Sequence, residues 1–526
     1  MDKAIIMGKT SVTGSFHLFI GKVLSSIILA VGSIILGRVM APAEYGIYAI
    51  ALIPSMTLTL FRDWGISRAT IKFISQYKSL DEDELIHDLI ITGSTFKLAI
   101  SLLLSLLSLF LASFIATTIF NRPETTSLIA IASIVILFES LVGISQSIFS
   151  GYERMEYISY ILICQAIIKS TVAPLLILLG YGAIGAVTGY AFSFIVTGLL
   201  GITLLYFRVF KHLKKSIFHF SGKIKTLKSM LKYGFPISIS EILGSFLYQF
   251  YAFLMAFYVT DAMVGNYQIA VNFAVFTSFF SYPLVTVLFP AFSKLDPKRE
   301  IELLRSVFSS AVKYASLFLV PATMATIILS GPAIETIYGQ KWIDAPFFLS
   351  LYALQNFFVL IGGLVADNFL KGVGETKILL KLSLLRLVLG IALALFLIPV
   401  FGIVGVILGT FFAELLNKLL SIFWLHKHYD ANPNYKSSIK IFLASAVSAL
   451  ITIFFLNLLV IPDWLKLIIG AGLFLIIYII ILPIFGAITQ SDIHKLKAMF
   501  SNLGIVTKII DIPLNIAEVI CSILHK

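Results

Sequence analysis

The stretch FHLFIGKVLSSIILAVGSIILGRVM (residues 16–40) contains only two charged side chains, Lys22 and Arg38. About 20 predominantly apolar residues in a helix are enough to cross a bilayer. The stretch is longer than the apolar part of a cleavable signal peptide, so we expect it to remain as a membrane-spanning helix. Similar apolar segments follow along the chain with little sequence between them.

The composition agrees with a protein whose solvent is mostly lipid. Of the 526 residues, 59% are hydrophobic and 13% are charged, and the mean hydropathy is +0.99. Soluble domains carry roughly 25% charged residues, so a secreted domain, a disordered chain, a nucleic-acid-binding protein and a soluble enzyme are excluded. Cys164 and Cys521 are far apart in sequence and fit no disulfide framework or metal spacing.

The pattern predicts an all-α polytopic membrane protein with about fourteen transmembrane helices. Proline and glycine inside the segments do not oppose this, because membrane helices tolerate them. The expected spans are 15–38, 44–61, 89–118, 127–150, 157–180, 182–207, 233–258, 262–290, 308–330, 345–370, 377–399, 402–424, 440–460 and 466–488.

The distribution of basic residues predicts the orientation. The termini and the loops on their side hold 28 of the 39 Lys and Arg residues, whereas the opposite loops hold three. Basic residues concentrate in cytoplasmic loops. We therefore expect a multi-pass protein of the cell membrane with both termini in the cytoplasm.

The sequence contains an internal repeat. Residues 43–51 (AEYGIYAIA) align with 262–270 (AMVGNYQIA) at an offset of 219, and residues 181–192 align with 401–412 at an offset of 220 through their glycines. Small residues allow close helix packing. We expect two six-helix lobes in parallel repeat, as in some transporters, followed by two extra helices. The predicted regions are lobe one at 1–207, a basic cytoplasmic loop at 208–232, lobe two at 233–424, two more spans within 425–490 and an interfacial amphipathic tail at 491–526.

The junction of the first two spans resembles a known family. Residues 36–52 (LGRVMAPAEYGIYAIAL) and 63–77 (DWGISRATIKFISQY) are similar to the start of polysaccharide-biosynthesis, O-antigen-type flippases of the MOP exporter superfamily. The sequence departs from the family at Met40-Ala41-Pro42, where Leu-Gly-Pro is usual. The resemblance implies two lobes around a central cavity and outward movement of an oligosaccharide linked to a polyprenyl phosphate or diphosphate. Lipid II flippases and multidrug exporters of the MATE type share this fold, so the fold alone does not select the substrate.

Charged residues inside the spans are the candidate substrate-binding groups, because each costs free energy unless it is paired or hydrated. Lys22 and Glu241 differ by the repeat offset, so we expect them at equivalent places, meeting when the cavity closes; the alternative is that both reach the membrane surface. Glu139 and Lys169 lie near the middle of their spans, where a structural pair competes with a cavity-lining role. Arg386 has no acidic neighbour in sequence, and an unpaired guanidinium suits phosphate; the alternatives are that it reaches the membrane surface or pairs with a residue of another helix. The full set of candidates is Lys22, Arg38, Glu139, Gln146, Lys169, Glu241, Gln249 and Arg386.

Other charged residues have simpler interpretations. Glu414 and Lys418, and Asp367 and Lys371, are expected to form pairs at i,i+4. Lys97 and Lys313 are expected to extend toward the cytoplasmic surface. Arg38 suits either the cavity or lipid headgroups, and Arg62 and Asp63 suit capping of a turn.

We therefore expect a transporter rather than an enzyme, with no catalytic residues, cofactor or metal. It would act as a monomer, driven by H⁺, Na⁺ or the membrane potential. Membrane lipids and the lipid-linked oligosaccharide are the expected partners, with a polysaccharide polymerase or glycosyltransferase as a further possibility. The alternatives are a cation-coupled drug exporter, a lipid II-type flippase and a membrane glycosyltransferase or polymerase.

Overall fold

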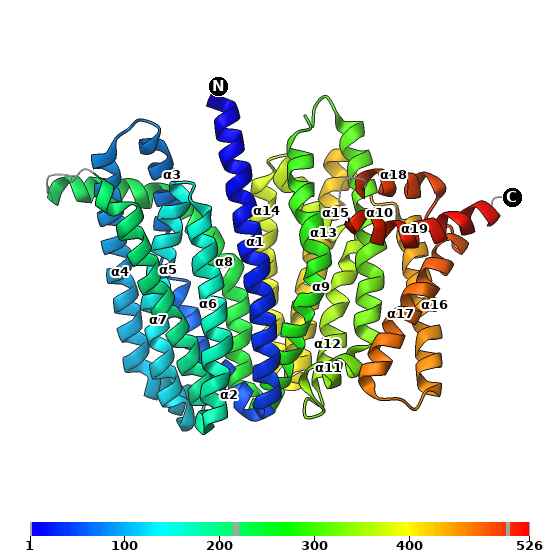
Figure 1. The fold of residues 1–526 in the computed structure, drawn as a ribbon, viewed down its shortest axis with the longest axis horizontal. Helices are drawn as coiled ribbons and strands as arrows, with labels where there is room; N and C mark the ends of the chain where they lie inside the picture. Colours follow the sequence, from blue (N-terminus) through cyan, green and yellow to red (C-terminus); the bar gives the residue numbers. More distant parts are fainter. Residues whose placement is uncertain (1–2, 214–219, 501–504, 525–526) are drawn as a thin grey trace. The chain divides into compact units, whose positions relative to one another are not determined.

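The computed structural model of the chain describes residues 3–213, 220–500 and 505–524. Every regular element in these ranges is a helix (Figure 1). The chain divides into two compact units, Met1–Gln268 and Ile269–Lys526. The all-helical class predicted from the sequence is therefore confirmed, and each unit is described separately below.

The first unit is a bundle of long helices with one short helix, α3, at one end. Its helices are α1 (Lys3–Val39), α2 (Pro42–Thr59), α3 (Ile66–Lys78), α4 (Asp83–Phe114), α5 (Thr126–Gly151), α6 (Met155–Leu176), α7 (Gly182–Arg208), α8 (Phe220–Tyr258) and the start of α9 (Asp261–Ser293). Short helical turns lie at η1 (Ile115–Ile119), η2 (Pro123–Thr125), η3 (Ile177–Tyr181) and η4 (Phe210–His212).

The second unit contains the rest of α9 and the helices that follow it. They are α10 (Ile301–Ile328), α11 (Ser330–Tyr338), α12 (Ala345–Ala353), η5 (Leu354–Ile361), α13 (Gly363–Gly372), α14 (Thr376–Phe401), α15 (Ile403–Tyr429), α16 (Tyr435–Leu458), α17 (Asp463–Ile484), α18 (Gln490–Phe500) and α19 (Ile505–Leu524). A bend of 55° separates Ala345–Ile361 from Gly363–Gly372, where Gly362 has a left-handed φ of 88°.

Ten helical stretches of the described chain are long and apolar enough to cross a membrane, or eleven if the bent pair forms one span. One of the ten, Met155–His212, contains both α6 and α7, which pack against each other. The multi-pass character expected from the sequence is confirmed, whereas the number fourteen remains a prediction.

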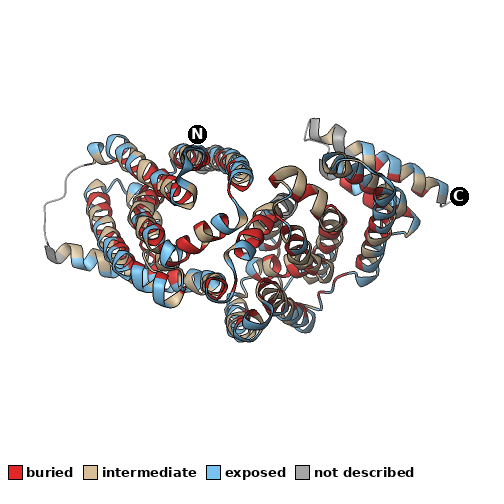
Figure 2. Cartoon of the chain, turned by 90° about the horizontal axis from the view of Figure 1, so that it is seen from below, coloured by how far each residue is buried: buried red, intermediate tan, exposed pale blue. Residues whose placement is uncertain are grey.

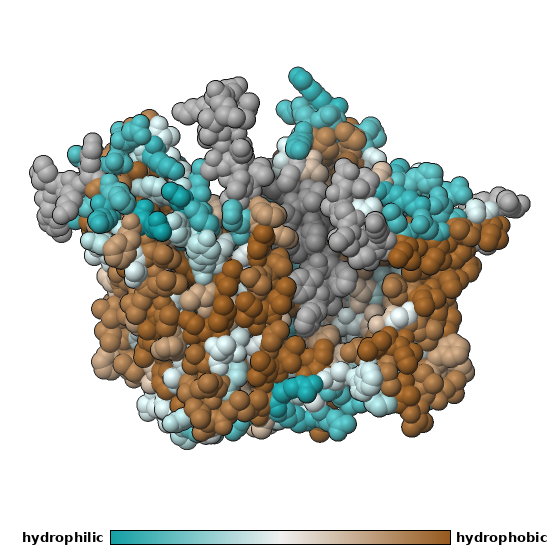
Figure 3. All heavy atoms as spheres, in the orientation of Figure 1, coloured by the Kyte–Doolittle hydropathy of each residue, from teal (hydrophilic) through white to brown (hydrophobic). Residues whose placement is uncertain are grey.

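The helices are packed with small polar residues inward and large apolar residues outward. On α4, Ser101, Ser105 and Ser108 are buried, whereas Leu103 and Phe110 are 60% and 80% exposed. The Ser105 hydroxyl donates a 2.8 Å hydrogen bond to the Ser133 carbonyl of α5. Figure 2 shows buried residues facing the interior of the bundle, and Figure 3 shows the apolar band across the middle of the helices. This arrangement suits lipid, where helices associate through close packing rather than through the hydrophobic effect.

Helices α1 and α6 run in the same direction and approach closely. A Cβ at Gly21 would lie 2.5 Å from the Ser159 side chain, and a Cβ at Gly32 would lie 2.2 Å from Ser170 Oγ. The Ser159 and Ser170 hydroxyls donate to carbonyls of α1, at 2.8 Å and 3.0 Å. Glycine on one helix and serine on the other therefore set the position of α1, which carries Lys22.

Candidate functional site

The turn between α2 and α3 holds a buried ion pair. Trp64 and Gly65 adopt left-handed φ values of 48° and 81°, and the sharp turn brings Asp63 back over the start of α3. Its carboxylate accepts hydrogen bonds from the backbone N–H (3.3 Å) and hydroxyl (2.6 Å) of Ser67, so its predicted capping role is confirmed. Lys97 Nζ of α4 lies 2.7 Å from Asp63 Oδ1, with its side chain 3% exposed. The prediction that Lys97 extends to the surface is therefore wrong.

The charge of Lys97 controls the ionisation of Asp63. Burial alone would raise the pKa of the Asp63 carboxyl, but the Lys97 charge and the hydrogen bonds from Lys97 and Ser67 outweigh that effect. The pKa of Asp63 is consequently held below its usual value, so its carboxyl group is ionised at neutral pH.

Glu139 and Lys169 do not pair with each other. Glu139 of α5 lies 2.7 Å from Arg62 Nη1, which reaches it from the α2–α3 turn. Lys169 Nζ of α6 lies 4.5 Å from the centre of the Tyr190 ring, a cation–π contact. The predicted structural pair between them is therefore wrong, because Arg62 of the α2–α3 turn and Tyr190 of α7 supply the partners instead.

Glu241 of α8 is paired with Arg68 of α3. Arg68 donates from Nε (3.0 Å) and Nη2 (2.6 Å) to the same carboxylate oxygen. Both side chains are about half exposed. Contact of Glu241 with Lys22 on closure of the cavity remains a prediction, and it would now require Glu241 to leave Arg68.

The remaining candidates of the first unit differ in exposure. Lys22 is exposed on α1, and no carboxylate of the described residues pairs with it. Arg38 is exposed in the last turn of the same helix. Gln146 of α5 and Gln249 of α8 are half-buried.

Arg122 connects two loops at the end of the first unit that lies opposite the α2–α3 turn. Its Nε lies 2.5 Å from Asp261 Oδ1, Nη2 donates to the Val259 carbonyl at 2.7 Å and Nη1 donates to the Phe120 carbonyl at 2.9 Å. The Arg122 side chain is 13% exposed. The connection between α8 and α9 is thus held against the connection that leads into α5.

A chain of four alternating charges lies in the second unit. Arg386 of α14 has its Nη1 3.0 Å from Glu414 Oε2 of α15. Lys418 follows one turn later on α15, and its Nζ lies 3.0 Å from Glu414 Oε1 and 2.6 Å from Asp367 Oδ2 of α13. The predicted pair of Glu414 with Lys418 is confirmed. The expected pairing of Asp367 with Lys371 is wrong. Arg386 has a structural partner from another helix, as one of its alternatives predicted, because α13, α14 and α15 meet at this point.

Lys313 is also paired rather than extended toward the surface. Lys313 is on α10, and its Nζ lies 2.6 Å from Oδ2 of Asp492, which is on α18. Asp492 also accepts hydrogen bonds from the backbone N–H (2.9 Å) and hydroxyl (2.6 Å) of Thr489. Lys97 and Lys313 are thus both paired with an aspartate. The partner of Lys97 is in the α2–α3 turn, and the partner of Lys313 is in the C-terminal helix α18.

Sequence reasoning missed the partners of these cations and the role of Arg122. Arg122 is one of the three basic residues of the loops opposite the termini, and the sequence shows both its place before the apolar run of α5 and the Asp261 that opens α9. No signal in a single sequence connects two residues 139 positions apart.

Comparison with known proteins identifies the family. The family described as polysaccharide biosynthesis protein matches residues 35–346, more than half of the chain. The chain belongs to this family. Among curated proteins, it is 23% identical over 276 residues to the probable low-salt glycan biosynthesis flippase Agl15 of Haloferax volcanii. That match covers 52% of this chain and 57% of the relative, so the chain spans little more than half of the relative's length.

Solved structures show the same fold. The lipid II flippase MurJ in an inward closed conformation has a TM-score of 0.71 at 21% identity, covering 89% of this chain and 98% of that one. An inward-facing multidrug resistance MATE family transporter of the MOP superfamily has a TM-score of 0.60 at 17% identity, covering 77% and 95%. This member of the polysaccharide biosynthesis family is therefore a membrane protein with the MOP transporter fold, as the resemblance implied.

Proposed function

We propose that this protein is a flippase that moves a polyprenyl-phosphate-linked or diphosphate-linked oligosaccharide from the cytoplasmic to the outer leaflet, without catalysing a chemical reaction. The observation that carries the proposal is the family match over residues 35–346. The likeness of the fold to a lipid II flippase over 89% of the chain agrees with it. The relative from Haloferax volcanii is itself named a glycan biosynthesis flippase.

The mechanism that we propose is alternating access. The phosphate and sugars would pass through a hydrated cavity, while the polyprenyl chain stays in lipid. The contact of Glu241 with Arg68, both half exposed, is of the kind that such a cycle breaks and remakes, because an exposed pair is worth only about 0–1 kcal/mol. The energy source, whether H⁺, Na⁺ or the membrane potential, is part of the same proposal.

Lys22 and Lys169 are the proposed phosphate-binding residues of the first unit. Neither has a carboxylate partner among the described residues, unlike Lys97 and Arg62. The register of α1 against α6, set at Gly21 and Gly32, places Lys22 and Lys169 at depths that differ by about 13 Å. We propose that they hold the phosphate at successive positions along its path.

Arg386 keeps a proposed role in the second unit, but as half of a pair. A phosphate that approached Arg386 would compete with Glu414, while Lys418 would remain as a partner for the released carboxylate. Glu139 and Glu241 are proposed to contact sugar hydroxyls or the coupling ion, and Arg38, Gln146 and Gln249 are proposed to line the cavity.

The experiment is a transport assay with purified protein in vesicles that contain a fluorescent lipid-linked oligosaccharide. A reducing agent added outside bleaches only the outer leaflet, so the accessible fraction reports flipping. We expect wild-type protein to raise this fraction, Lys22→Gln and Lys169→Gln to slow flipping, and Lys381→Gln, an exposed cation of α14, to behave as wild type. Wild-type vesicles that expose no more oligosaccharide than protein-free vesicles would overturn the proposed function.

A drug exporter of the MATE type is the second candidate, favoured by the fold of the MATE family transporter. It makes the opposite prediction in the same vesicles: an organic cation would be transported, and the lipid-linked oligosaccharide would not.

A further inference from the structure

The first part of α8 lies crosswise at one end of the first unit before the helix turns into the bundle (Figure 1). It is amphipathic. Ile224, Leu227, Leu231 and Phe235 recur at helical spacing, and Lys225, Lys228 and Lys232 lie between them. A basic helix of this kind suits the boundary between lipid headgroups and acyl chains.

Contacts with α3 and α4 fix this segment in place. Gly65 and Gly234 are in direct backbone contact, since a Cβ on Gly65 would lie 2.0 Å from the Gly234 carbonyl carbon. Met230 is fully buried. Lys72 Nζ lies 4.0 Å from the centre of the Tyr233 ring. The position of the segment is therefore determined by the protein itself.

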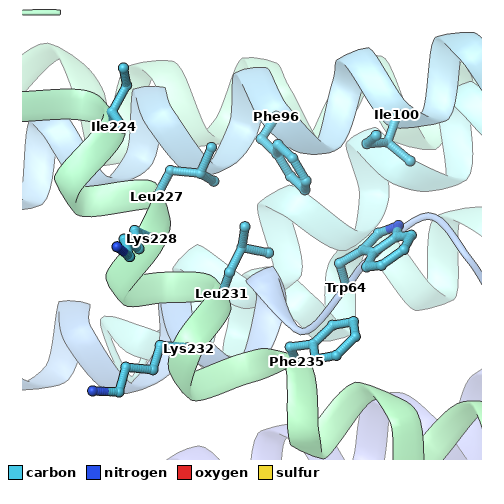
Figure 4. A pocket seen from close by; sticks show the side chains of 9 residues that line it. All are labelled: Trp64, Phe96, Ile100, Ile224, Leu227, Lys228, Leu231, Lys232 and Phe235. Atoms are coloured by element: carbon cyan, nitrogen blue, oxygen red, sulfur yellow. The ribbon is translucent and has the colours of Figure 1, made fainter. Parts of the chain in front are cut away.

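Beside these contacts the protein leaves a hollow of about 740 Å³. Its walls are Trp64, Phe96, Ile100 and the apolar side of α8. Figure 4 shows Leu227, Leu231 and Phe235 turned toward Phe96, Ile100 and Trp64. Trp64 stacks on Phe235 with ring centres 5.6 Å apart and planes 12° apart. The volume lies in the range of sites that hold a small molecule, roughly 300–1,000 Å³.

The rim of the hollow is positively charged. Lys228 and Lys232 contribute to its lining and, in Figure 4, point away from the aromatic wall. Lysine behaves in this way at membrane boundaries, with the stem on apolar surface and the ammonium group in water. No carboxylate is among the described residues that line the hollow. The site therefore offers an apolar surface for a hydrocarbon chain and two cations for an anionic head.

Charge and size favour a phospholipid over the polyprenyl carrier. The two rim lysines, Lys228 and Lys232, complement a single anionic head, and the hollow of about 740 Å³ is bounded by Ile224 at one end and Phe235 at the other. It has room for an acyl chain, whereas a polyprenyl chain of many isoprene units is larger and would extend beyond the hollow.

We propose that this hollow binds one anionic phospholipid, with its phosphate at Lys228 and Lys232 and one acyl chain against Trp64, Phe96 and Ile100. The lipid is a resident of the surrounding membrane and is distinct from the transported oligosaccharide. The inference does not depend on the proposed function, because it concerns binding alone.

The test uses the fluorescence of Trp64, which bromine atoms on a lipid chain quench at short range. Full-length protein in mixed micelles is titrated with brominated phosphatidylglycerol or brominated phosphatidylcholine, and the Trp64 signal is the difference between wild type and Trp64→Phe. We expect half-maximal quenching by phosphatidylglycerol at an about tenfold lower lipid fraction than by phosphatidylcholine. The double variant Lys228→Gln, Lys232→Gln should lose that preference.

Matched lysines provide the control. Lys377 and Lys381 of α14 are also exposed and one helical turn apart, so Lys377→Gln, Lys381→Gln removes the same charge elsewhere. We expect that variant to keep the preference. Equal quenching by both lipids, or loss of the preference in both double variants, would overturn the proposal. Relief of quenching by undecaprenyl phosphate at a lower fraction than by unbrominated phosphatidylglycerol would also overturn it, because the hollow would then belong to the carrier lipid.

Discussion

Gly46 and Gly265 stand at equivalent positions of the sequence repeat, and each lies against the residue that begins the other's helix. A Cβ on Gly46 would lie 1.8 Å from the Asp261 carbonyl oxygen, and a Cβ on Gly265 would lie 2.1 Å from the Pro42 carbonyl oxygen. Both pairs, 46 with 265 and 42 with 261, have the repeat offset of 219. The ends of α2 and α9 therefore meet in a reciprocal contact that only glycine allows.

Replacing Gly46 with alanine should destabilise the protein by about 1–3 kcal/mol, because the new methyl group must displace backbone rather than a side chain. The measurement is the thermal unfolding midpoint in detergent. Gly472→Ala on α17 is the control, since a Cβ there meets nothing within 4 Å and alanine is the better helix former. A Gly46→Ala midpoint equal to or above that of the wild type would contradict the reciprocal contact.

Removing the cation of the Asp63–Lys97 pair should be more costly than removing both charges. Lys97→Met leaves the Asp63 carboxylate with its hydrogen bonds from Ser67 but without its counter-charge. Breaking a buried pair in this way costs at most about 3–5 kcal/mol, and less here because the Asp63 side chain is 25% exposed. The double variant Lys97→Met, Asp63→Asn should recover much of the loss, because no buried charge remains. The measurement is the thermal unfolding midpoint of the single and double variants. A double variant less stable than Lys97→Met would contradict the predicted cost of an uncompensated Asp63 charge.

The attachment of α18 to α10 should depend on acidity. Burial raises the pKa of the Asp492 carboxyl, but hydrogen bonds from Lys313 and Thr489 and the Lys313 charge outweigh burial and hold that pKa below its usual value. A carboxylate whose pKa is lower in the folded protein stabilises fully above its unfolded pKa, about 3.9 for aspartate, and loses that contribution as pH falls through the lowered folded value.

Hydrogen exchange of α18 as a function of pH measures this effect. We expect the protection of α18, with α17 as the internal reference, to stay constant at neutral pH and to fall only in acid. Asp492→Asn should show the weaker protection at every pH. A loss of protection already between pH 7 and pH 5 in the wild type would contradict the prediction, because the lowered pKa of Asp492 places the loss at lower pH.

Arg386 should contribute to transport through geometry as well as charge. Arg386→Ala should slow flipping while leaving the protein in the membrane, and Arg386→Lys should restore part of the rate, because lysine keeps the charge but loses the planar two-pronged donor. Glu414→Gln serves as the companion variant, because it removes the competitor of the phosphate. Normal glycan export by Arg386→Ala in cells without other flippases would remove Arg386 from the phosphate path.

The orientation predicted from basic residues is open to direct measurement. Reporter enzymes that work only in the cytoplasm should be active when fused after Lys526 or inserted within 208–232, and inactive at Gly339. An active reporter at Gly339 would reverse or break the assignment.

The sequence by itself determined the membrane class, the internal repeat and the family resemblance. Each of these depends on local or periodic properties: the length of apolar runs, the recurrence of Gly46 at Gly265, and the junction at residues 36–77. Such properties do not depend on which helix packs against which. The i,i+4 pair of Glu414 and Lys418 was predictable for the same reason, because helical geometry alone brings the two residues together.

Only the tertiary structure decided the partners of the buried charges. Lys97 pairs with Asp63, Lys313 with Asp492 and Arg386 with Glu414, across 34, 179 and 28 positions of sequence. The free energy of a charge in an apolar region depends on the groups within a few ångströms of it, and those groups come from whichever helices pack there. A single sequence shows that a buried cation must find a partner, and packing selects which carboxylate it is.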